Sequence, residues 1–479
     1  MLDVIIVGAG LSGIGAACRL RTEVPGATFT VLESRDASGG TWDLFRYPGV
    51  RSDSDMFTLG YDFRPWVGTT ALAGGEEILK YVRDTATEYD VDRSIEYGRR
   101  VTGASWSADD RHWTVTIQDP HTGEISTRAC RFLYLCTGYY RYDEGYTPEW
   151  PGRESYAGTI IHPQQWPEDL DVFAKRIVVI GSGATAVTLV PALARLGARV
   201  TMLQRSPSYI FSLPSRDVVA ELLGKVLPER TAYAASRWKN IKMSTAIYQL
   251  CQKYPQQLRA FLQGGVRRRL PAGYDVDTHF TPTYDPWDQR MCLVPDADLF
   301  KAIGSGKAEM ATDEIESFTP SGLRLKSGRK LAADIIVTAT GLNLYPLGGI
   351  ELAVDDEPVR IPEHVVYKGL MLDGVPNLVF ALGYTNAPWT LKVDLVSSFF
   401  ARLLNDMRRS GREVVVPRLP KTPMTTTPFI EMSSGYFERA RKLMPLQGED
   451  VPWRLRQHYA KDAKLLKDQV VDDGVLDFS

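Results

Sequence analysis

The sequence predicts an α/β protein, and two observations predict it. An apolar strand over residues 4–7 leads into the glycine-rich turn GAGLSG, then into a helix to about residue 21 and a second strand over residues 28–32. The same order recurs over residues 177–203, where the turn reads GSGATA. Repeated β-turn-α-β units are typical of parallel sheets covered by helices. We therefore expect two dinucleotide-binding Rossmann-type domains, together with a helical insertion.

Both turns have the glycine spacing of a dinucleotide-binding loop. The first glycine permits a tight turn, the second lets the backbone approach a pyrophosphate, and the third position allows close packing of helix and strand. The N-terminus of the following helix then favours the phosphate charge. The residues concerned are Gly8, Gly10 and Gly13 in the first unit, and Gly181, Gly183, Thr185 and Ala186 in the second.

The residue that ends the second strand differs between the two units. Glu33 lies 25 residues after Gly8, where a carboxylate can accept both hydroxyls of an adenosine ribose, as FAD or NAD requires. The second unit has Arg205 and Ser206 at that place, with no acid to repel a phosphate and a guanidinium to pair with one. This pattern favours NADPH; a solvated arginine at the start of a loop is the alternative interpretation.

Length, charge and cysteine content exclude several classes of protein. At about 150 residues per domain, 479 residues have room for roughly three domains. The 56 Lys and Arg against 58 Asp and Glu exclude a globally basic nucleic-acid binder. The five cysteines show neither CxxC nor zinc-ligand spacing, so we expect no disulfide framework and no metal site. Neither a secretory signal nor an apolar run long enough for a transmembrane helix is apparent, and we expect a cytoplasmic protein.

Two dinucleotide sites in one chain predict electron transfer between a nicotinamide and a flavin. A disulfide reductase would need a redox-active cysteine pair beside the flavin, and the sequence offers no close pair. Molecular oxygen is therefore the expected acceptor of the electrons.

Two motifs carry a resemblance to a known family. Residues 39–53 read GGTWDLFRYPGVRSD, and residues 156–167 read YAGTIIHPQQWP, with tyrosine where the family has phenylalanine. On these motifs the sequence resembles the type I Baeyer–Villiger monooxygenases, which depend on FAD and NADPH. The resemblance covers essentially the whole chain and is greatest to the branch that contains the mycobacterial ethionamide-activating monooxygenase.

The resemblance implies a reaction. NADPH would reduce FAD, O2 would add at the flavin C4a, and the resulting peroxide would convert a ketone into an ester or lactone, or oxygenate a sulfide or thioamide. The expected partners are thus a small-molecule ketone or organosulfur substrate and O2. Two alternatives stay open: a flavin monooxygenase that hydroxylates nitrogen or sulfur without Baeyer–Villiger activity, and a non-enzymatic NADPH-binding regulator.

The resemblance also assigns site residues. Arg290 aligns with the family's active-site arginine, and Asp53 aligns with the acid that pairs with it. Gln289 stands where many ketone-oxidising relatives carry a lysine that helps to hold the coenzyme phosphate, which leaves more of that role to Arg205. Further expected site residues are Gly40, Thr41 and Trp42 at the flavin, Gly158, His162 and Trp166 in a moving linker, and Tyr61 and Trp389 as walls of the substrate pocket.

In this family the flavin domain is discontinuous, and the chain divides accordingly. We expect the FAD-binding domain over residues 1–145 and 345–479, and the NADPH-binding domain over residues 146–210, which include the linker, and 281–344. The helical insertion occupies residues 211–280.

One segment of the insertion has an unusual composition. Residues 230–269 contain nine Lys or Arg and no Asp or Glu, with aromatic and aliphatic residues between them. Such a segment could contact an anionic membrane surface or another subunit, or it could be a solvated face that makes the coenzyme cleft positive. The oligomeric state stays open.

Overall fold

The computed structural model describes residues 1–68, 70–289, 291–432 and 434–479. Its centre is a mixed sheet built around β1 (Leu2–Val7), which runs parallel to β2 (Phe29–Leu32) on one side and to β6 (Ile125–Leu135) on the other. Burial on both faces of the sheet explains why residues 4–7 of β1 form a continuous apolar run rather than an alternating one. The predicted first β-turn-α-β unit is confirmed.

Strands from distant parts of the chain complete this first sheet. The order along it is β20-β19-β4-β5-β6-β1-β2-β3, and β23 pairs with β6. The remaining strands are β3 (Ile95–Glu96), β4 (Arg100–Ser107), β5 (His112–Gln118), β19 (Glu351–Val354), β20 (Glu357–Pro358) and β23 (Leu378–Phe380). Segments beyond residue 350 thus lie in the same sheet as the N-terminus.

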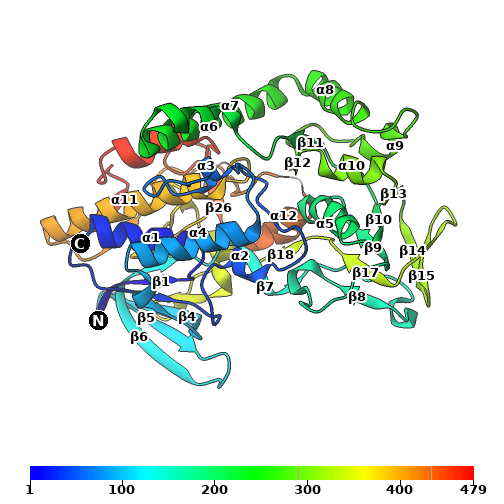
Figure 1. Cartoon of the computed structure of the whole chain (residues 1–479). Coiled ribbons are helices and arrows are strands. Elements are labelled where there is room, and N and C mark those ends of the chain that lie inside the picture. Colours follow the sequence, from blue (N-terminus) through cyan, green and yellow to red (C-terminus); the bar gives the residue numbers. More distant parts are fainter. Residues whose placement is uncertain (69, 290, 433) are drawn as a thin grey trace.

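The second sheet is parallel throughout its described strands, in the order β13-β10-β9-β17-β8. It contains the second predicted β-turn-α-β unit and lies beside the first sheet (Figure 1). Its strands are β8 (Thr159–Ile161), β9 (Arg176–Ile180), β10 (Arg199–Gln204), β13 (Ala308–Thr312) and β17 (Ile335–Thr338).

Smaller ladders lie outside the two main sheets. They are β7 (Tyr140–Gly145) with β18 (Leu342–Leu344), β11 (Ile210–Leu213) with β12 (Cys292–Pro295), β14 (Ile315–Thr319) with β15 (Gly322–Leu325) and β16 (Lys330–Ala332), β21 (Val366–Tyr367) with β22 (Met371–Leu372), β24 (Val415–Pro417) with β27 (Leu476–Phe478), and β25 (Thr426–Pro428) with β26 (Leu446–Gly448). The β11–β12 pair holds together the two ends of the helical insertion.

Helices cover both sheets. In the first domain α1 (Leu11–Glu23) packs along α11 (Trp389–Ser410), which ends at Gly411 in the left-handed region with φ +69°. The other helices of the two domains are α2 (Thr41–Leu44), α3 (Met56–Leu59), α4 (Gly75–Glu88), α5 (Ala184–Arg195), α10 (Asp298–Gly304), α12 (Gly435–Ala440) and α13 (Tyr459–Ala463).

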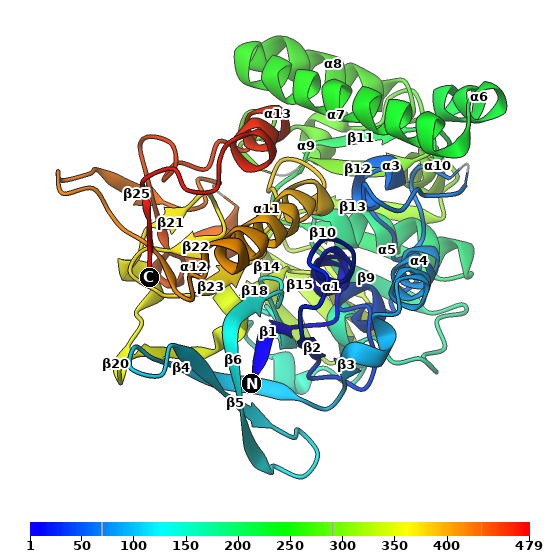
Figure 2. The same cartoon turned by 90° about the vertical axis from the view of Figure 1, so that its left-hand side faces the viewer.

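The predicted helical insertion is also present. It consists of α6 (Val218–Val226), α7 (Glu229–Lys253), α8 (Pro255–Arg267) and the short α9 (Val276–Phe280). Helices α6, α7 and α8 lie along one outer edge of the molecule, away from both sheets (Figures 1 and 2).

In both β-turn-α-β units the packing of the chain requires a glycine at the first position of the loop. A Cβ on Gly8 would lie 2.7 Å from the carbonyl oxygen of Cys136, and a Cβ on Gly181 would lie 2.2 Å from that of Ala339. Both glycines also have positive φ, +100° and +142°. In each unit the segment after the third strand, β6 or β17, therefore presses directly against the first glycine of the loop.

Candidate functional site

A cavity of about 450 Å³ opens at the carboxyl ends of β1, β2 and β6. This is the edge at which parallel sheets bind their ligands. Residues from the N-terminal third and from residues 345–389 line the cavity together. The site is therefore formed only when these two parts of the first domain, which are far apart in the sequence, pack together.

Most residues predicted at the flavin lie in this cavity. The lining includes Gly8, Gly10, Glu33, Gly40, Thr41, Trp42 and Asp53. Gly13 lies beneath the loop instead, where its Cβ would be 1.8 Å from the carbonyl oxygen of Gly8. The third position must be glycine because the helix packs too closely against the end of the strand for a side chain to fit.

The cavity fits the dinucleotide end of FAD. A Cβ on Gly40 would lie 2.9 Å from the Cα of Gly10, so that two backbones meet with no side chain between them, as a pyrophosphate site requires. Glu33 is buried, and its Oε2 accepts a hydrogen bond of 2.7 Å from the backbone N–H of Ala9. A buried carboxylate at this strand end is the group expected to bind a ribose.

Helix α2 holds Trp42 at the cavity through the residue that follows it. The buried carboxylate of Asp43 pairs with Arg35, Arg46 and Arg83 at 2.7, 2.8 and 2.7 Å. Three cations on one carboxylate leave the local charge positive, and the Arg35 side chain also donates to the carbonyl oxygen of Gly40 at 3.2 Å. These contacts fix the short helix against the glycine loop.

The second half of the motif at residues 39–53 packs against the second domain rather than the first. Residues 45–51, which we call the strap, extend into the hydrophobic core of the second domain, where Phe45, Tyr47 and Val50 pack. Gly49 lies so close to α5 that a Cβ on it would be 2.7 Å from the Cβ of Ala192. Arg51 then pairs with Asp298 at 2.7 Å.

Asp53 follows the strap directly and returns the chain to the cavity. Burial raises the pKa of Tyr47 to about 12, and the nearby charge of Asp53 contributes in the same direction, while the side chain of Thr185 bonds the phenol. Thr185 belongs to the second nucleotide loop, so the strap brings that loop and Asp53 close together. Arg290 lies outside the described residues, and its pairing with Asp53 stays a prediction.

The residues predicted at the nicotinamide coenzyme gather at the carboxyl edge of the second sheet. The loop between β9 and α5 contains Gly181, Gly183, Thr185 and Ala186, and a Cβ on Gly183 would meet nothing within 4 Å. Arg205 and Ser206 follow β10 directly, and both are exposed. The glycine loop is therefore open at Gly183, as the approach of a pyrophosphate requires.

An acid that the sequence did not indicate lies near this arginine. The hydrogen bond and charge of Lys326 lower the pKa of Glu314, and the charge of Arg205 adds to this effect. Because Glu314 is paired with Lys326, its charge is largely compensated. Glu314 therefore does not neutralise the charge of Arg205.

The three linker residues lie outside the cavity. His162 Nε2 donates to the carbonyl oxygen of Gly341 at 3.0 Å, and its Nδ1 accepts from the backbone N–H of Gln164 at 3.2 Å. Burial lowers the pKa of His162, which favours the neutral ring. Gly158 packs on the ring of Tyr156, and Trp166 is half-buried against the second core. With both ring nitrogens bonded, His162 connects the linker to Gly341, which lies between β17 and β18.

The two predicted pocket walls have different outcomes. Tyr61 is fully buried beneath α1, where its hydroxyl donates to the carbonyl oxygen of Leu11 at 2.6 Å, and it does not line the described cavity. Trp389 does line the cavity, and its Nε1 donates to Ser12 Oγ at 2.8 Å. Cavity residues that the sequence did not single out include Ser12, Arg35, Tyr139 and Tyr142.

Comparison with known proteins identifies the family. A model of the pyridine nucleotide-disulphide oxidoreductases matches residues 5–260. The FAD-containing monooxygenase EthA of Mycobacterium tuberculosis is 54% identical over 100% of this chain and 98% of its own, and the putative FAD-containing monooxygenase MymA of the same species is 52% identical over 100% and 97%. The chain belongs to the family of FAD-containing monooxygenases.

The fold of this monooxygenase matches a solved relative over its full length. An oxidized steroid monooxygenase bound to NADP superimposes with a TM-score of 0.76 at 22% identity and covers 100% of this chain and 99% of its own. As a monooxygenase, the protein is an oxidoreductase that consumes O2 and a small-molecule substrate. All five cysteines lie among the described residues, are buried and form no disulfide bond, although the wider family is named for a disulphide.

The helical insertion of the monooxygenase is anchored behind Asp53. Arg237 of α7 is buried and donates from Nη1 to the carbonyl oxygens of Phe57, Thr58 and Gly60 at 3.0, 3.2 and 2.7 Å, at the C-terminal end of α3. Cations are favoured at this end of a helix. Asp55, the N-cap of α3, accepts a hydrogen bond of 2.8 Å from Asn240 of the same insertion helix.

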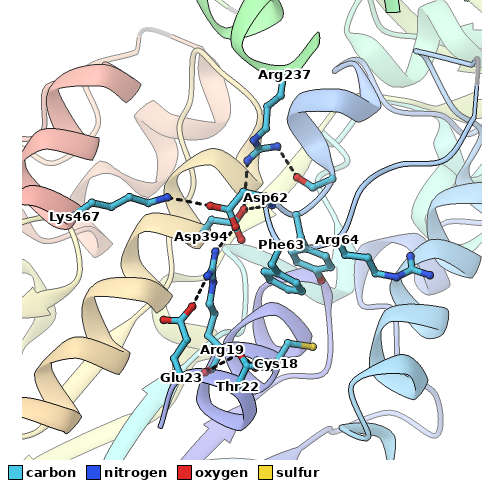
Figure 3. A network of polar contacts seen from close by, with 12 residues as sticks. Cys18, Arg19, Thr22, Glu23, Asp62, Phe63, Arg64, Arg237, Asp394 and Lys467 are labelled. Atoms are coloured by element: carbon cyan, nitrogen blue, oxygen red, sulfur yellow. Dashed lines mark hydrogen bonds and ion pairs between the residues drawn. The ribbon is translucent and has the colours of Figure 1, made fainter. Parts of the chain in front are cut away.

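A buried network of charges extends from this anchor. Arg237 also contacts Asp394 of α11 at 3.3 Å, and Asp394 accepts a hydrogen bond from the backbone N–H of Asp62 at 3.0 Å (Figure 3). Asp62 pairs with Arg19 and with Lys467, the latter at 3.0 Å. Burial and the neighbouring charge of Asp62 raise the pKa of Asp394 to about 7.

Proposed function

We propose that this monooxygenase uses NADPH to reduce a bound FAD and inserts one oxygen atom of O2 into a ketone or an organosulfur compound. The observation that carries the proposal is the strap, because it extends from Trp42 at the flavin cavity to the second nucleotide loop and returns with Asp53. A flavin and a nicotinamide that exchange a hydride must meet at such a junction.

Each nucleotide has its proposed set of residues. For FAD these are Gly8, Gly10 and Gly13 with Glu33 at the ribose, and Gly40, Thr41 and Trp42 at the flavin end. For NADPH we propose Gly181, Gly183, Thr185 and Ala186 at the pyrophosphate, with Arg205 and Ser206 at the 2′-phosphate. The names of EthA, which contains FAD, and of the steroid monooxygenase bound to NADP support this pair of coenzymes.

When bound, FAD supplies hydride acceptance and the activation of O2. The chain must then hold a positive charge where negative charge develops during the reaction. We assign this role to Arg290 and assign to Asp53 the orientation of that guanidinium, since a carboxylate both directs an arginine and offsets the cost of burying its charge. Gly158, His162 and Trp166 serve as a hinge between the two nucleotide domains.

The proposed domains follow from the same assignment. The FAD-binding domain comprises residues 1–145 and 345–479, the NADPH-binding domain residues 146–210 and 281–344, and the helical insertion residues 211–280. The participation of β19, β20, β23 and α11 in the first domain supports the return of the chain after residue 345.

The decisive experiment follows labelled oxygen into products. The purified FAD-loaded protein is incubated with NADPH and ¹⁸O2 together with a ketone, a sulfide or a thioamide, and products are identified by mass spectrometry. We expect one labelled atom in an ester or lactone from the ketone, or in a sulfoxide or S-oxide from the sulfur compounds. Sulfur products without any ester would support the alternative that lacks Baeyer–Villiger activity. NADPH oxidation that yields only hydrogen peroxide with every substrate would contradict the proposal.

A further inference from the structure

Exposed apolar side chains are concentrated on the helical insertion. Among the described residues 21 large apolar side chains are exposed, and nine of them lie within residues 218–261, less than a tenth of the chain. They are Val218, Val219, Leu222, Val226, Trp238, Met243, Leu250, Tyr254 and Phe261. We call the outer surface of α6, α7 and α8 that bears them the insertion face. A concentration of exposed apolar side chains on one part of the surface, with charged residues between them, is typical of an interaction site.

The helix period aligns these side chains. Val218, Leu222 and Val226 are spaced by four residues, so they lie along one side of α6, with exposed fractions of 62, 57 and 76%. On α7, Trp238 is 65% exposed. Lys242 follows it by one turn and lies with its Nζ 5.7 Å from the indole ring. An exposed tryptophan beside a lysine is typical of a surface that is apolar at depth and charged at its rim.

The charge of the insertion face has one sign. Of the nine basic residues in 230–269, four pair with aspartates from outside the segment: Arg237, Lys239, Arg259 and Arg267. The other five and Lys225 are exposed and form no ion pair within the described part of the chain: Arg230, Lys242, Lys253, Arg268 and Arg269. The segment contains no acid. The basic composition is therefore only partly compensated by the fold.

The insertion presents this face as a fixed surface. Lys239 of α7 donates to both carboxylate oxygens of Asp217, the N-cap of α6, at 2.7 and 2.6 Å. Arg237 anchors the opposite side of α7 on the first domain, as described above. Helices α6 and α7 thus need no rearrangement to expose their apolar residues.

We propose that the insertion face docks on an anionic lipid bilayer. Apolar side chains that enter the boundary between headgroups and acyl chains, flanked by lysines and arginines, are the composition that binds such surfaces. A second copy of this chain is the less suitable occupant, because a symmetric contact would bring like charges of the two faces together. No helix in the described residues is long and apolar enough to cross a membrane, so the proposed contact is peripheral.

This proposal concerns where the enzyme binds and is independent of the substrate that it oxidises. Its test is sedimentation of the purified FAD-loaded protein with phosphatidylcholine vesicles of which about a third is phosphatidylglycerol, against phosphatidylcholine alone. We expect binding to the anionic vesicles and at least about 10-fold weaker partitioning to the neutral ones. Raising the salt to about 1 M, where the Debye length falls to about 3 Å, should weaken the binding.

Three variants separate the contributions. L222Q/V226Q/W238Q should lower partitioning by about 10-fold or more, and K225Q/K242Q/K253Q should abolish the preference for anionic lipid, with NADPH oxidation unchanged in both. The control is F173Q, because Phe173 is 70% exposed and lies outside the insertion. Failure to bind anionic vesicles at low salt, or binding that the first triple variant does not weaken, would overturn the proposal. A triple variant that converts an oligomer into a monomer would overturn it too and would assign the face to a subunit contact.

Discussion

Glu33 and Arg205 occupy the same place in two copies of one structural unit, and they differ in both charge and exposure. Glu33 is buried and bonded to the N–H of Ala9, so it is part of the loop that it faces. Arg205 is exposed at the end of β10, where it can reach a group outside the protein. A fixed acceptor suits a resident nucleotide, and an exposed cation suits a coenzyme that exchanges with solvent.

Replacing Arg205 tests the selection of the coenzyme. R205A should raise the KM for NADPH roughly 10- to 100-fold and leave that for NADH nearly unchanged, because NADH has no 2′-phosphate to lose. Steady-state kinetics with both coenzymes measure the two KM values. The matched control is R199A at the opposite end of β10, where an exposed arginine is remote from the carboxyl edge. An unchanged preference for NADPH in R205A would show that another residue holds the phosphate.

Replacing Arg290 and Asp53 tests the proposed pair. R290A should abolish product formation while FAD stays bound, since loss of an oriented charge of this kind costs about 2.7 to 4 kcal/mol, or roughly 100-fold or more in rate. D53A should act in the same direction but more mildly. Product yield per NADPH and the flavin absorbance are the two measurements. Undiminished turnover in D53A would mean that the two residues do not act together.

At the scale of elements, the insertion helix α7 positions α3, which begins three residues after Asp53. Arg237 supplies donors to three carbonyl oxygens and a charge to Asp394, and Asn240 holds the N-cap of the same helix. The insertion therefore acts on the cavity from behind, through α3, whose last residue Leu59 lines the cavity.

Removing the cation of this anchor should be costly. R237M leaves the buried carboxylate of Asp394 and three carbonyl oxygens without their donor, and breaking a buried pair in this way costs about 3 to 5 kcal/mol. Urea unfolding of the FAD-loaded protein measures the loss. K242M lies on the exposed side of the same helix and should change the free energy of unfolding by less than about 0.5 kcal/mol. Equal midpoints for wild type and R237M would contradict the role of the anchor.

The same network predicts a dependence of stability on pH. Because the pKa of Asp394 is raised from 3.8 to about 7, the folded state binds a proton that the unfolded state releases between these values. This group therefore lowers the free energy of unfolding as pH rises from about 4 to about 7, by up to about 1.4 kcal/mol per pH unit. D394N lacks the effect, so its stability relative to wild type should increase between pH 5 and pH 7, measured by urea midpoints.

The control is an aspartate whose pKa is shifted in the opposite direction. Hydrogen bonds from Arg176 lower the pKa of Asp334 to about 2, and its contribution is constant above pH 5. The stability of D334N relative to wild type should therefore be equal at pH 5 and pH 7. A difference between D394N and wild type that is likewise constant would contradict the raised pKa.

At the scale of the whole molecule, the sequence predicted what depends on local spacing. Strand, turn and helix follow one another within about 30 residues, and Glu33 is found by its distance from Gly8. The sequence could not pair Ser12 with Trp389, which are 377 residues apart. It also could not indicate that Arg237 points inward while Lys242 points outward, since composition gives the charge of a helix but not the side that the rest of the chain covers.

The strap shows the same dependence on long-range packing, and a pair of glycines tests it. Gly49 and Gly26 have nearly equal φ, +78° and +75°, but a Cβ on Gly49 would meet Ala192 at 2.7 Å, whereas a Cβ on Gly26 would meet nothing within 4 Å. Both alanine variants bear the strain of positive φ, about 1 kcal/mol. The free energy of unfolding, measured with urea, should fall by about 1 to 3 kcal/mol more in G49A than in G26A, because overpacking against Ala192 adds to the backbone strain. Equal losses in the two variants would mean that the strap can shift away from α5.

The strap also limits the exchange of one domain for the corresponding domain of a relative. A chimera that joins the nucleotide domain of one relative to the flavin domain of another would be cut at the proposed boundary after residue 145, and residues 45–51 would then remain with the flavin part. Their Tyr47 and Gly49 would then meet a foreign α5. A functional exchange of domains must therefore transfer this short segment together with residues 146–344, although it lies about 100 residues before the boundary.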